Sequence, residues 1–85
     1  GAIADPDQNP IFTAMQQLRD YRIQNGISQR TLARDTGIAQ STISEAEKGV
    51  IELRPVTMAR LAAGLGLRMT ITFESLDATP DIDPA

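Results

Sequence analysis

The sequence predicts an all-α domain of four to five helices that is followed by one short β-strand. Between residues 10 and 67, apolar residues recur at the spacing of α-helices, and glycines interrupt this pattern at intervals of about one short helix. Between residues 68 and 75, apolar and polar residues alternate instead, which is the period of a strand. A chain of 85 residues can bury only one modest core, so we expect a single domain.

The first helix is expected to begin at Pro10, because proline suits the first turn of a helix and Asn9 before it can act as the N-cap. It should end near Asn25, since Gly26 can adopt the left-handed conformation that closes a helix. One stripe of this segment carries four residues at helical spacing: Ile11, Met15, Leu18 and Arg22.

The second helix is expected to be short, with Ser28 as its N-cap and Gly37 as the residue that stops it. Leu32 and Ala33 are expected to form its inner face. Four polar residues are expected to point outward: Gln29, Arg30, Arg34 and Asp35.

The third helix is predicted to span residues 40–48 and to be closed by Gly49. Ile43 and Ala46 lie three residues apart and should face inward, and Ile38 should be buried just before the helix. These residues are nearly all the apolar surface that the segment can bury. Most of this helix must therefore face something other than the core.

The fourth helix is predicted to begin at Pro55, again a proline in a first turn, and to end at Gly66. Its apolar residues follow the helical period: Met58, Leu61, Ala62 and Leu65.

The predicted strand, residues 68–75, carries three apolar residues that alternate with arginine, threonine and glutamate: Met69, Ile71 and Phe73. A lone strand leaves its backbone N–H and C=O groups unpaired. We therefore expect antiparallel pairing with a second copy of the chain in a two-fold dimer. The alternative left open by the sequence is that the strand packs on the fourth helix of its own chain.

The two ends of the chain differ from the middle in composition. Residues 1–9 and 76–85 are rich in Pro and Asp and show no periodicity, so they are predicted to be a flexible N-terminal flank and a flexible acidic tail. The net charge is −3, but the stretch from Arg19 to Arg60 holds seven basic and five acidic residues. The acidity is therefore concentrated in the ends, and the helical middle is weakly basic.

The composition also excludes several classes of function. The chain has no cysteine and no histidine, which removes disulfides, thiolate or imidazole metal sites and the usual general acid–base residue. We expect neither an enzyme nor a cofactor or metal site. No apolar run approaches the roughly 20 residues that span a bilayer, so a soluble cytoplasmic protein without membrane contact is expected.

The second and third predicted helices are joined by a tight turn at residues 37–39, and the third is polar on its open face. This is the outline of a helix-turn-helix, in which the second helix of the pair enters the DNA major groove. Small and amide side chains on such a helix let its backbone approach the base edges. The sequence therefore predicts a DNA-binding domain over residues 10–67. The plain alternative is a solvated helix face.

The run LRDYRIQNGISQRTLARDTGIAQSTISEAEKG resembles the lambda-repressor-like helix-turn-helix family of the XRE type, over roughly Met15 to Leu67. The resemblance depends on spaced residues: Arg22, Ser28 with Gln29, Leu32 with Ala33, Gly37 with Ile38, Ser41, Ile43 with Ser44, and Glu47. The following stretch LRMTITFE is similar to the C-terminal strand of antitoxins of the Hip and Hig type, where the strand helps to form the dimer.

The family resemblance implies roles for individual residues of this chain. Gln40, Ser41 and Glu45 match positions that touch base edges. The expected phosphate contacts come from the resemblance, from charge and from the start of the second helix: Gln29, Arg30, Thr42, Ser44, Lys48 and Arg54. Arg22 and Glu47 match a partly buried ion pair between the first and third helices.

These features together predict a homodimeric transcriptional repressor that binds double-stranded DNA at a palindromic operator. The strand resemblance implies an antitoxin that represses its own operon and neutralises a toxin protein as a further partner. Two alternatives stay open: a phage or restriction-control regulator without a toxin, and a protein-interaction module that no longer reads DNA.

Overall fold

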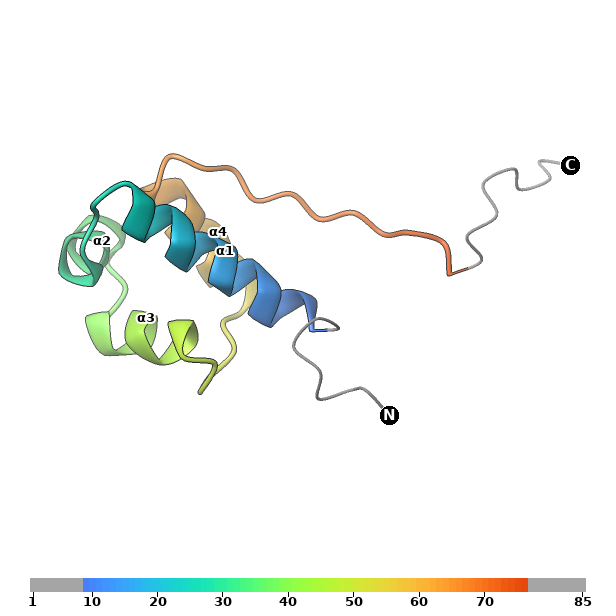
Figure 1. Cartoon of the computed structure of the whole chain (residues 1–85), viewed down its shortest axis with the longest axis horizontal. Helices are drawn as coiled ribbons and strands as arrows, with labels where there is room; N and C mark the ends of the chain where they lie inside the picture. Colours follow the sequence, from blue (N-terminus) through green and yellow to red (C-terminus); the bar gives the residue numbers. More distant parts are fainter. Residues whose placement is uncertain (1–8, 77–85) are drawn as a thin grey trace, which may run out of the picture.

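The computed structural model describes residues 9–76, and this part of the chain folds into four α-helices (Figure 1). They are α1 (Pro10–Gln24), α2 (Gln29–Thr36), α3 (Gln40–Glu47) and α4 (Pro55–Gly64). α1 and α2 each pack against both α3 and α4. The predicted all-α bundle is confirmed for the described residues, with four helices whose ends lie within two residues of the expected positions.

Side-chain caps begin the first two helices as the sequence predicted. The Asn9 Oδ1 atom accepts hydrogen bonds from the backbone N–H groups of Ile11 and Phe12, at 3.0 and 3.1 Å. The Ser28 Oγ atom accepts one from the N–H of Thr31 at 2.9 Å. These bonds satisfy N–H groups that a helix start leaves without intrahelical partners, and they fix where α1 and α2 begin.

The turn between α2 and α3 is held by a glycine and a threonine. Gly37 adopts a φ of 76°, in the left-handed region that residues with a Cβ rarely enter. The Thr36 hydroxyl donates to the carbonyl of Leu32 at 2.7 Å and accepts from the N–H of Ile38 at 3.2 Å. The turn is thus bonded on both sides, which fixes the direction in which α3 leaves α2.

The core draws on all four helices and on the loops between them. Ile43 and Ala46 of α3 are 0% and 1% exposed, so the small apolar face of this helix is completely used. The buried core also holds Ile38, as expected, and the remaining members come from the other elements: Met15, Leu32, Leu53, Met58, Leu61, Ala62 and Leu65. α3 has no further apolar surface to offer the bundle.

The loop after α3 lies close against the start of α1. Gly49 has a φ of 80°, and a Cβ built on it would stand 2.8 Å from the Cε1 atom of Phe12. Nearby, the Asn9 Nδ2 atom donates to the Glu52 carboxylate at 3.3 Å. Only glycine fits both the conformation and the space at position 49, so the chain can turn away from α3 directly against the Phe12 ring.

Residues 67–75 run as an extended segment along α1 and then past its N-terminal end (Figure 1). Leu67 and Met69 are half-buried against the core, whereas residues 70–76 are exposed. Residues 9–76 contain no β-strand, because a strand needs a ladder partner and this segment meets none among these residues. The strand expected at residues 68–75 stays a prediction. The predicted flexible flanks lie outside the described residues, apart from Asn9 and Leu76.

Candidate nucleic-acid interface

α3 lies at one edge of the bundle, with one side turned away from the other helices (Figure 1). Its open side carries the three residues expected to contact bases, since Gln40, Ser41 and Glu45 are all exposed. Thr42 and Ser44 are half-buried at the flanks of this side. The helix is therefore sharply divided between a fully used apolar face and a polar face that no other helix covers.

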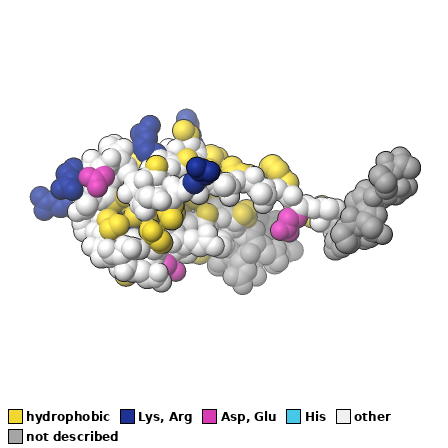
Figure 2. Space-filling model, turned by 90° about the horizontal axis from the view of Figure 1, so that it is seen from above, with side chains coloured by type: hydrophobic (Ala, Val, Ile, Leu, Met, Phe, Trp, Pro, Cys, Tyr) yellow, Lys and Arg dark blue, Asp and Glu magenta, His cyan; other side chains and the backbone are white. Residues whose placement is uncertain are grey.

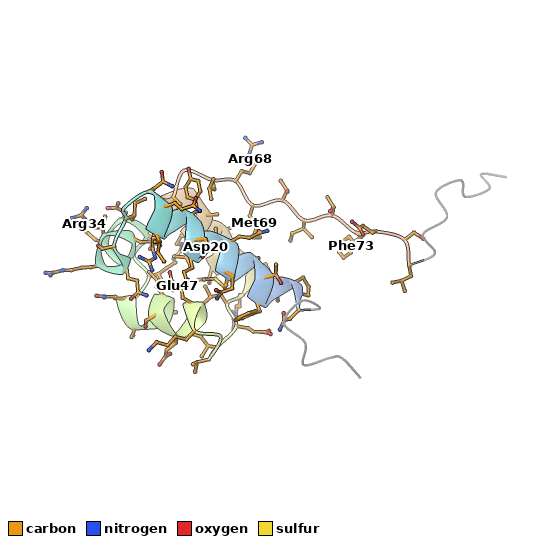
Figure 3. The ribbon with its side chains drawn as sticks, viewed as in Figure 1. Asp20, Arg34, Glu47, Arg68, Met69 and Phe73 are labelled. Carbon is orange, nitrogen blue, oxygen red and sulfur yellow. The ribbon has the colours of Figure 1, made fainter. Side chains whose placement is uncertain are left out.

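The last residue of α3 is tied into the bundle by a buried ion pair. The Arg22 Nε atom donates to Glu47 Oε2, and Arg22 Nη2 donates to Glu47 Oε1, both at 2.8 Å. Arg22 and Glu47 are only 9% and 7% exposed, and Glu47 lies between α1 and α3 (Figure 3). The structure thus brings together the two residues that the sequence resemblance paired, in the two-pronged geometry that arginine and carboxylate favour.

Two glutamines extend this ion pair into a network. Gln29 Nε2 donates to Glu47 Oε1 at 2.9 Å, and Gln16 Nε2 donates to the backbone carbonyl of Glu47 at 2.8 Å. The third guanidinium nitrogen of Arg22 donates to the carbonyl of Ile27 at 2.9 Å. Within residues 9–76, no buried side-chain nitrogen or oxygen lacks a hydrogen-bond partner.

The Glu47 network fixes the end of α3 from two sides. Arg22 and Gln16 reach it from α1, and Gln29 reaches it from the first turn of α2. The turn through Gly37 fixes the other end of the helix. With both ends held, the exposed stripe of α3 is presented at one set angle, which recognition of base edges requires.

The position of Gln29 differs from the expectation. The sequence predicted that its side chain would point outward and contact a phosphate, but it is half-buried and bonded to Glu47. The role of Gln16 was not predicted at all, because its contact spans 31 residues of sequence and no local pattern marks it. Both side chains are amides at helix positions that sequence reasoning treats as solvated.

The remaining cations expected to contact phosphates are all exposed. Arg30 is exposed in the first turn of α2, Lys48 is the C-cap residue of α3, and Arg54 is the N-cap residue of α4. Arg34 points away from the bundle, next to Asp35 at 3.2 Å (Figure 3). Among residues 9–76 there is no group of three acidic side chains that could hold a metal ion, and no helix suited to cross a bilayer.

Burial and hydrogen bonding act in opposite directions on the pKa of Glu47. Burial alone would raise this pKa, because it disfavours the charged carboxylate. The hydrogen bonds from Arg22 and Gln29, together with the positive charges of Arg22 and Arg19, favour the carboxylate and outweigh burial. The pKa of Glu47 is therefore lowered from its ordinary value of 4.5.

This shift predicts a loss of stability in acid. Because the folded protein holds Glu47 ionised more strongly than the unfolded chain does, the stabilisation is complete above the unfolded pKa and disappears as the pH falls through the folded pKa. The free energy of unfolding should therefore decrease from about pH 4.5 downward. Urea unfolding across this range measures the effect.

The matched control is Glu47→Gln, which cannot lose a proton. The difference in unfolding free energy between the wild-type protein and Glu47→Gln should be largest near neutral pH and should shrink as the pH falls. A difference that stayed constant from about pH 7 to pH 3 would contradict the assignment.

The fold and the interface define a helix-turn-helix DNA-binding protein: two short helices joined by a glycine turn, the second buried along one face and open along the other. The family model HTH_3, described as helix-turn-helix, matches residues 18–71, and the chain belongs to this XRE-type family of DNA-binding regulators. No curated protein matches the chain. The family match supports double-stranded DNA as the ligand and transcription regulation as the function, but it gives no support to an antitoxin role.

Proposed function

We propose that this protein is a sequence-specific repressor that binds a palindromic operator as a homodimer and reads bases through α3. The observation that carries the proposal is the unused face of α3. No hydrogen bond or ion pair within residues 9–76 engages the side chains of Gln40, Ser41 or Glu45, although both ends of the helix are fixed. A rigid helix with free polar groups suits the major groove.

The side chains of the exposed stripe have distinct chemistry toward bases. The amide of Gln40 can make two hydrogen bonds to adenine at once, because its N–H can donate to N7 while its oxygen accepts from the N6 amino group. Ser41 can donate or accept and is more tolerant. Glu45 can accept from the amino group of cytosine, and it disfavours sites without that donor because its charge would face phosphates.

Exposed cations at the end of α3 and at the starts of α2 and α4 would set the register on the duplex. Arg30, Lys48 and Arg54 supply charge for phosphates, and Thr42 and Ser44 supply hydroxyl donors. Gln29 can still offer its backbone N–H at the start of α2 while its side chain stays on Glu47. Binding that depends on these contacts weakens steeply with salt.

A two-fold dimer would place two copies of α3 on successive turns of the same DNA face, about 34 Å apart. The test is binding of the purified protein to the DNA upstream of its own gene, at several salt concentrations, against a scrambled duplex of equal composition. Specific binding to an inverted repeat with two chains per site supports the proposal. Equal binding to both duplexes would contradict it and would favour a module that does not read sequence.

Gln40→Ala should weaken operator binding by about 1 to 3 kcal/mol and relax the sequence preference at one base pair of each half-site. The physical reason is the loss of the two-pronged contact to adenine, while the fold is unaffected because the side chain is exposed. Fluorescence anisotropy on operator variants measures both effects. Gln24→Ala, an exposed glutamine in the last turn of α1, is the matched control and should change neither.

If Gln40→Ala kept the wild-type base preference at every operator position, the assignment of Gln40 would be wrong. Unchanged far-UV circular dichroism and thermal unfolding of the variant would show that the comparison concerns binding alone.

An antitoxin role is a second candidate, favoured by the exposed apolar residues of the C-terminal segment. Ile71, Phe73 and Leu76 are 62%, 94% and 104% exposed. DNA binding by α3 does not account for this exposed apolar surface, and such surface often marks a contact with another protein. Co-expression with the product of the adjacent gene tests this candidate. Co-purification and relief of that product's toxicity would support it, whereas a neighbour that neither binds nor harms the cell would leave a regulator without a toxin.

A further inference from the structure

The extended segment after α4 has two different faces. Its odd-numbered residues from Leu67 to Phe73 are apolar, and their burial decreases along the chain: Leu67 and Met69 are half-buried, Ile71 is 62% exposed and Phe73 is 94% exposed. The even-numbered residues from Arg68 to Glu74 are polar and exposed. Figure 2 shows hydrophobic side chains following this segment along the top of the molecule. The apolar face thus continues beyond the surface that the four helices cover.

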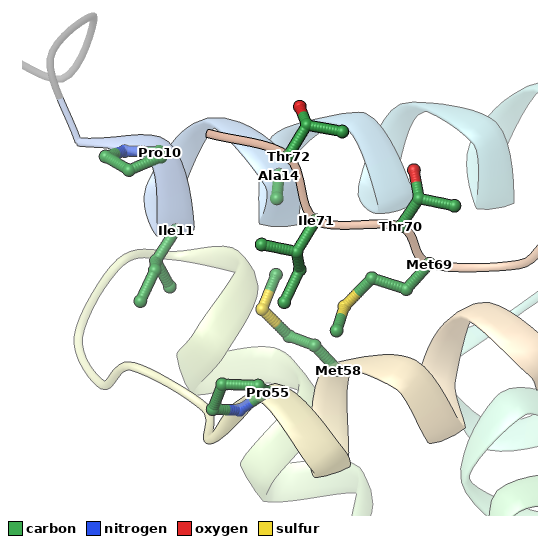
Figure 4. Close-up of a pocket in the computed structure, with 9 residues that line it drawn as sticks. All are labelled: Pro10, Ile11, Ala14, Pro55, Met58, Met69, Thr70, Ile71 and Thr72. Carbon is green, nitrogen blue, oxygen red and sulfur yellow. The ribbon is translucent and has the colours of Figure 1, made fainter. Parts of the chain in front are cut away.

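Beneath Ile71 lies an open apolar groove of about 400 Å³, between the N-terminal ends of α1 and α4 (Figure 4). In this groove, the side chains of Met69 and Ile71 point toward Met58 (Figure 4). A second groove of about 350 Å³ on the far side of Met69 is also lined by Met58. Met69 therefore leaves apolar space on either side that residues 9–76 do not fill.

The sequence of this segment is nearly a palindrome in chemical terms. In RMTITFE, residues 68–74, the central Ile71 is flanked on each side by a threonine, then by a large apolar residue, then by a charge. The two end charges have opposite sign, because Arg68 stands at one end and Glu74 at the other. A strand with this pattern is complementary to a second copy of itself that runs in the opposite direction.

We propose that two chains pair antiparallel through residues 68–74 with the two-fold axis at Ile71, so that the partner's Phe73 covers the groove surface beside Met69. This inference rests on the dimer of the proposed function and adds its register. The register places Arg68 opposite Glu74, Met69 opposite Phe73, Thr70 opposite Thr72 and Ile71 opposite itself. The ion pairs occur twice in each dimer.

Neighbouring registers are chemically worse. Moving the axis to Thr72 pairs Arg68 with Leu76 and Met69 with Ser75. Moving it to Thr70 still pairs apolar residues with each other, but it leaves both charges without a partner, because Arg68 then stands opposite Thr72 and Glu74 opposite Gly66. A slip of a single residue turns Phe73 to the polar face of the partner strand. Within residues 68–74, only the axis at Ile71 both pairs opposite charges and keeps apolar residues opposite apolar residues.

The groove fits the side chain that this register delivers. The partner's Phe73 stands opposite Met69, next to Met58, and thioether sulfurs make favourable contacts with aromatic rings. Phe73 loses its exposure to water in this arrangement, and the backbone groups of residues 68–74 in both chains gain ladder partners. Each copy supplies both a groove and a phenylalanine, so the contact is closed and stops at two chains.

A charge exchange tests the register without touching the apolar face. Arg68→Glu and Glu74→Arg should each weaken the dimer about tenfold, because each places two like charges opposite each other at two positions. The double variant should return the dissociation constant to within about twofold of the wild type. Analytical ultracentrifugation measures all four proteins. A double variant no tighter than the single ones would overturn the register.

Cysteine cross-linking measures the same register directly, since the natural chain contains no cysteine. Under oxidation, a mixture of Arg68→Cys and Glu74→Cys chains should form covalent dimers, and neither variant alone should do so. The mixtures of Thr70→Cys with Glu74→Cys, and of Arg68→Cys with Thr72→Cys, report the axis at Thr72 and at Thr70. All four positions are exposed, so helix content should be unchanged.

The outcomes separate this inference from the proposed function. Cross-linking in either of the two control mixtures, in a protein that is dimeric and binds its operator, overturns the register and leaves the proposed function standing. A protein that stays monomeric at all concentrations and in all mixtures overturns both.

Discussion

Glu47→Ala is expected to lower the free energy of unfolding by about 3 to 5 kcal/mol, a large part of the total of about 5 to 15 kcal/mol that small domains have. The physical reason is that Arg22 stays buried with its charge when its partner is removed. The amide of Gln29 also loses its acceptor. Urea unfolding near pH 7, followed by far-UV circular dichroism, measures the change.

Two comparison proteins isolate the cause. Asp35→Ala removes an ion pair with Arg34 that is largely exposed, and it should cost under about 1 kcal/mol. Arg22→Met combined with Glu47→Leu removes both buried charges together and should recover much of the lost stability. If Glu47→Ala cost no more than Asp35→Ala, the network around Glu47 would not hold the bundle together.

Glu47→Ala should also weaken DNA binding by more than the loss of folded protein alone explains. Glu47 is the last residue of α3, and its side chain connects that helix to α1 and α2. Without this connection, the C-terminal end of α3 is held less firmly, and the angle of its exposed stripe toward base edges is less well fixed. The hydrogen bond from Gln16 to the Glu47 backbone is independent of the side chain and would remain.

Phe73→Asp is expected to dissociate the proposed dimer, with a dissociation constant raised about 100-fold or more. Burying a phenylalanine side chain contributes about 1.5 to 3 kcal/mol, and a two-fold dimer buries two of them. The side chain is 94% exposed in the single chain, so its replacement should leave the bundle folded. Sedimentation velocity over a range of concentrations measures the change in assembly.

Thr72→Asp is the matched control for Phe73→Asp, because it adds the same charge on the polar face of the same segment. It should change dimerisation far less. Operator affinity should fall with Phe73→Asp, since each α3 would then bind one half-site alone. If Phe73→Asp stayed dimeric, the C-terminal segment would not be the dimer contact, and packing on the chain's own α4 would be favoured.

Local signals predicted the helical part of the fold well. Asn9 and Ser28 cap α1 and α2 because short polar side chains before a helix satisfy its first N–H groups wherever the chain folds. Gly37 ends α2 because a left-handed residue is needed there and glycine adopts it without strain. Such preferences act within a few residues, so they can be read directly from sequence.

Contacts between distant residues were harder to predict. Arg22 and Glu47 were paired through the family resemblance, since nothing local connects residues 25 positions apart. Gln29 was expected to face solvent, and the structure shows it half-buried on Glu47. A glutamine can serve a phosphate, water or a buried carboxylate equally well, so its role depends on what the fold places beside it.

The sequence by itself determined the helices, their ends, the buried residues of each and the apolar poverty of α3, because periodicity and capping are properties of short segments. Only the tertiary structure decided how α3 is held. It gathered Gln16, Arg22 and Gln29 around Glu47, from two helices and across up to 31 residues of chain. It also showed that the apolar face of the C-terminal segment extends beyond the surface that the four helices cover. Both depend on which surfaces meet when the helices pack, and that is a property of the whole chain.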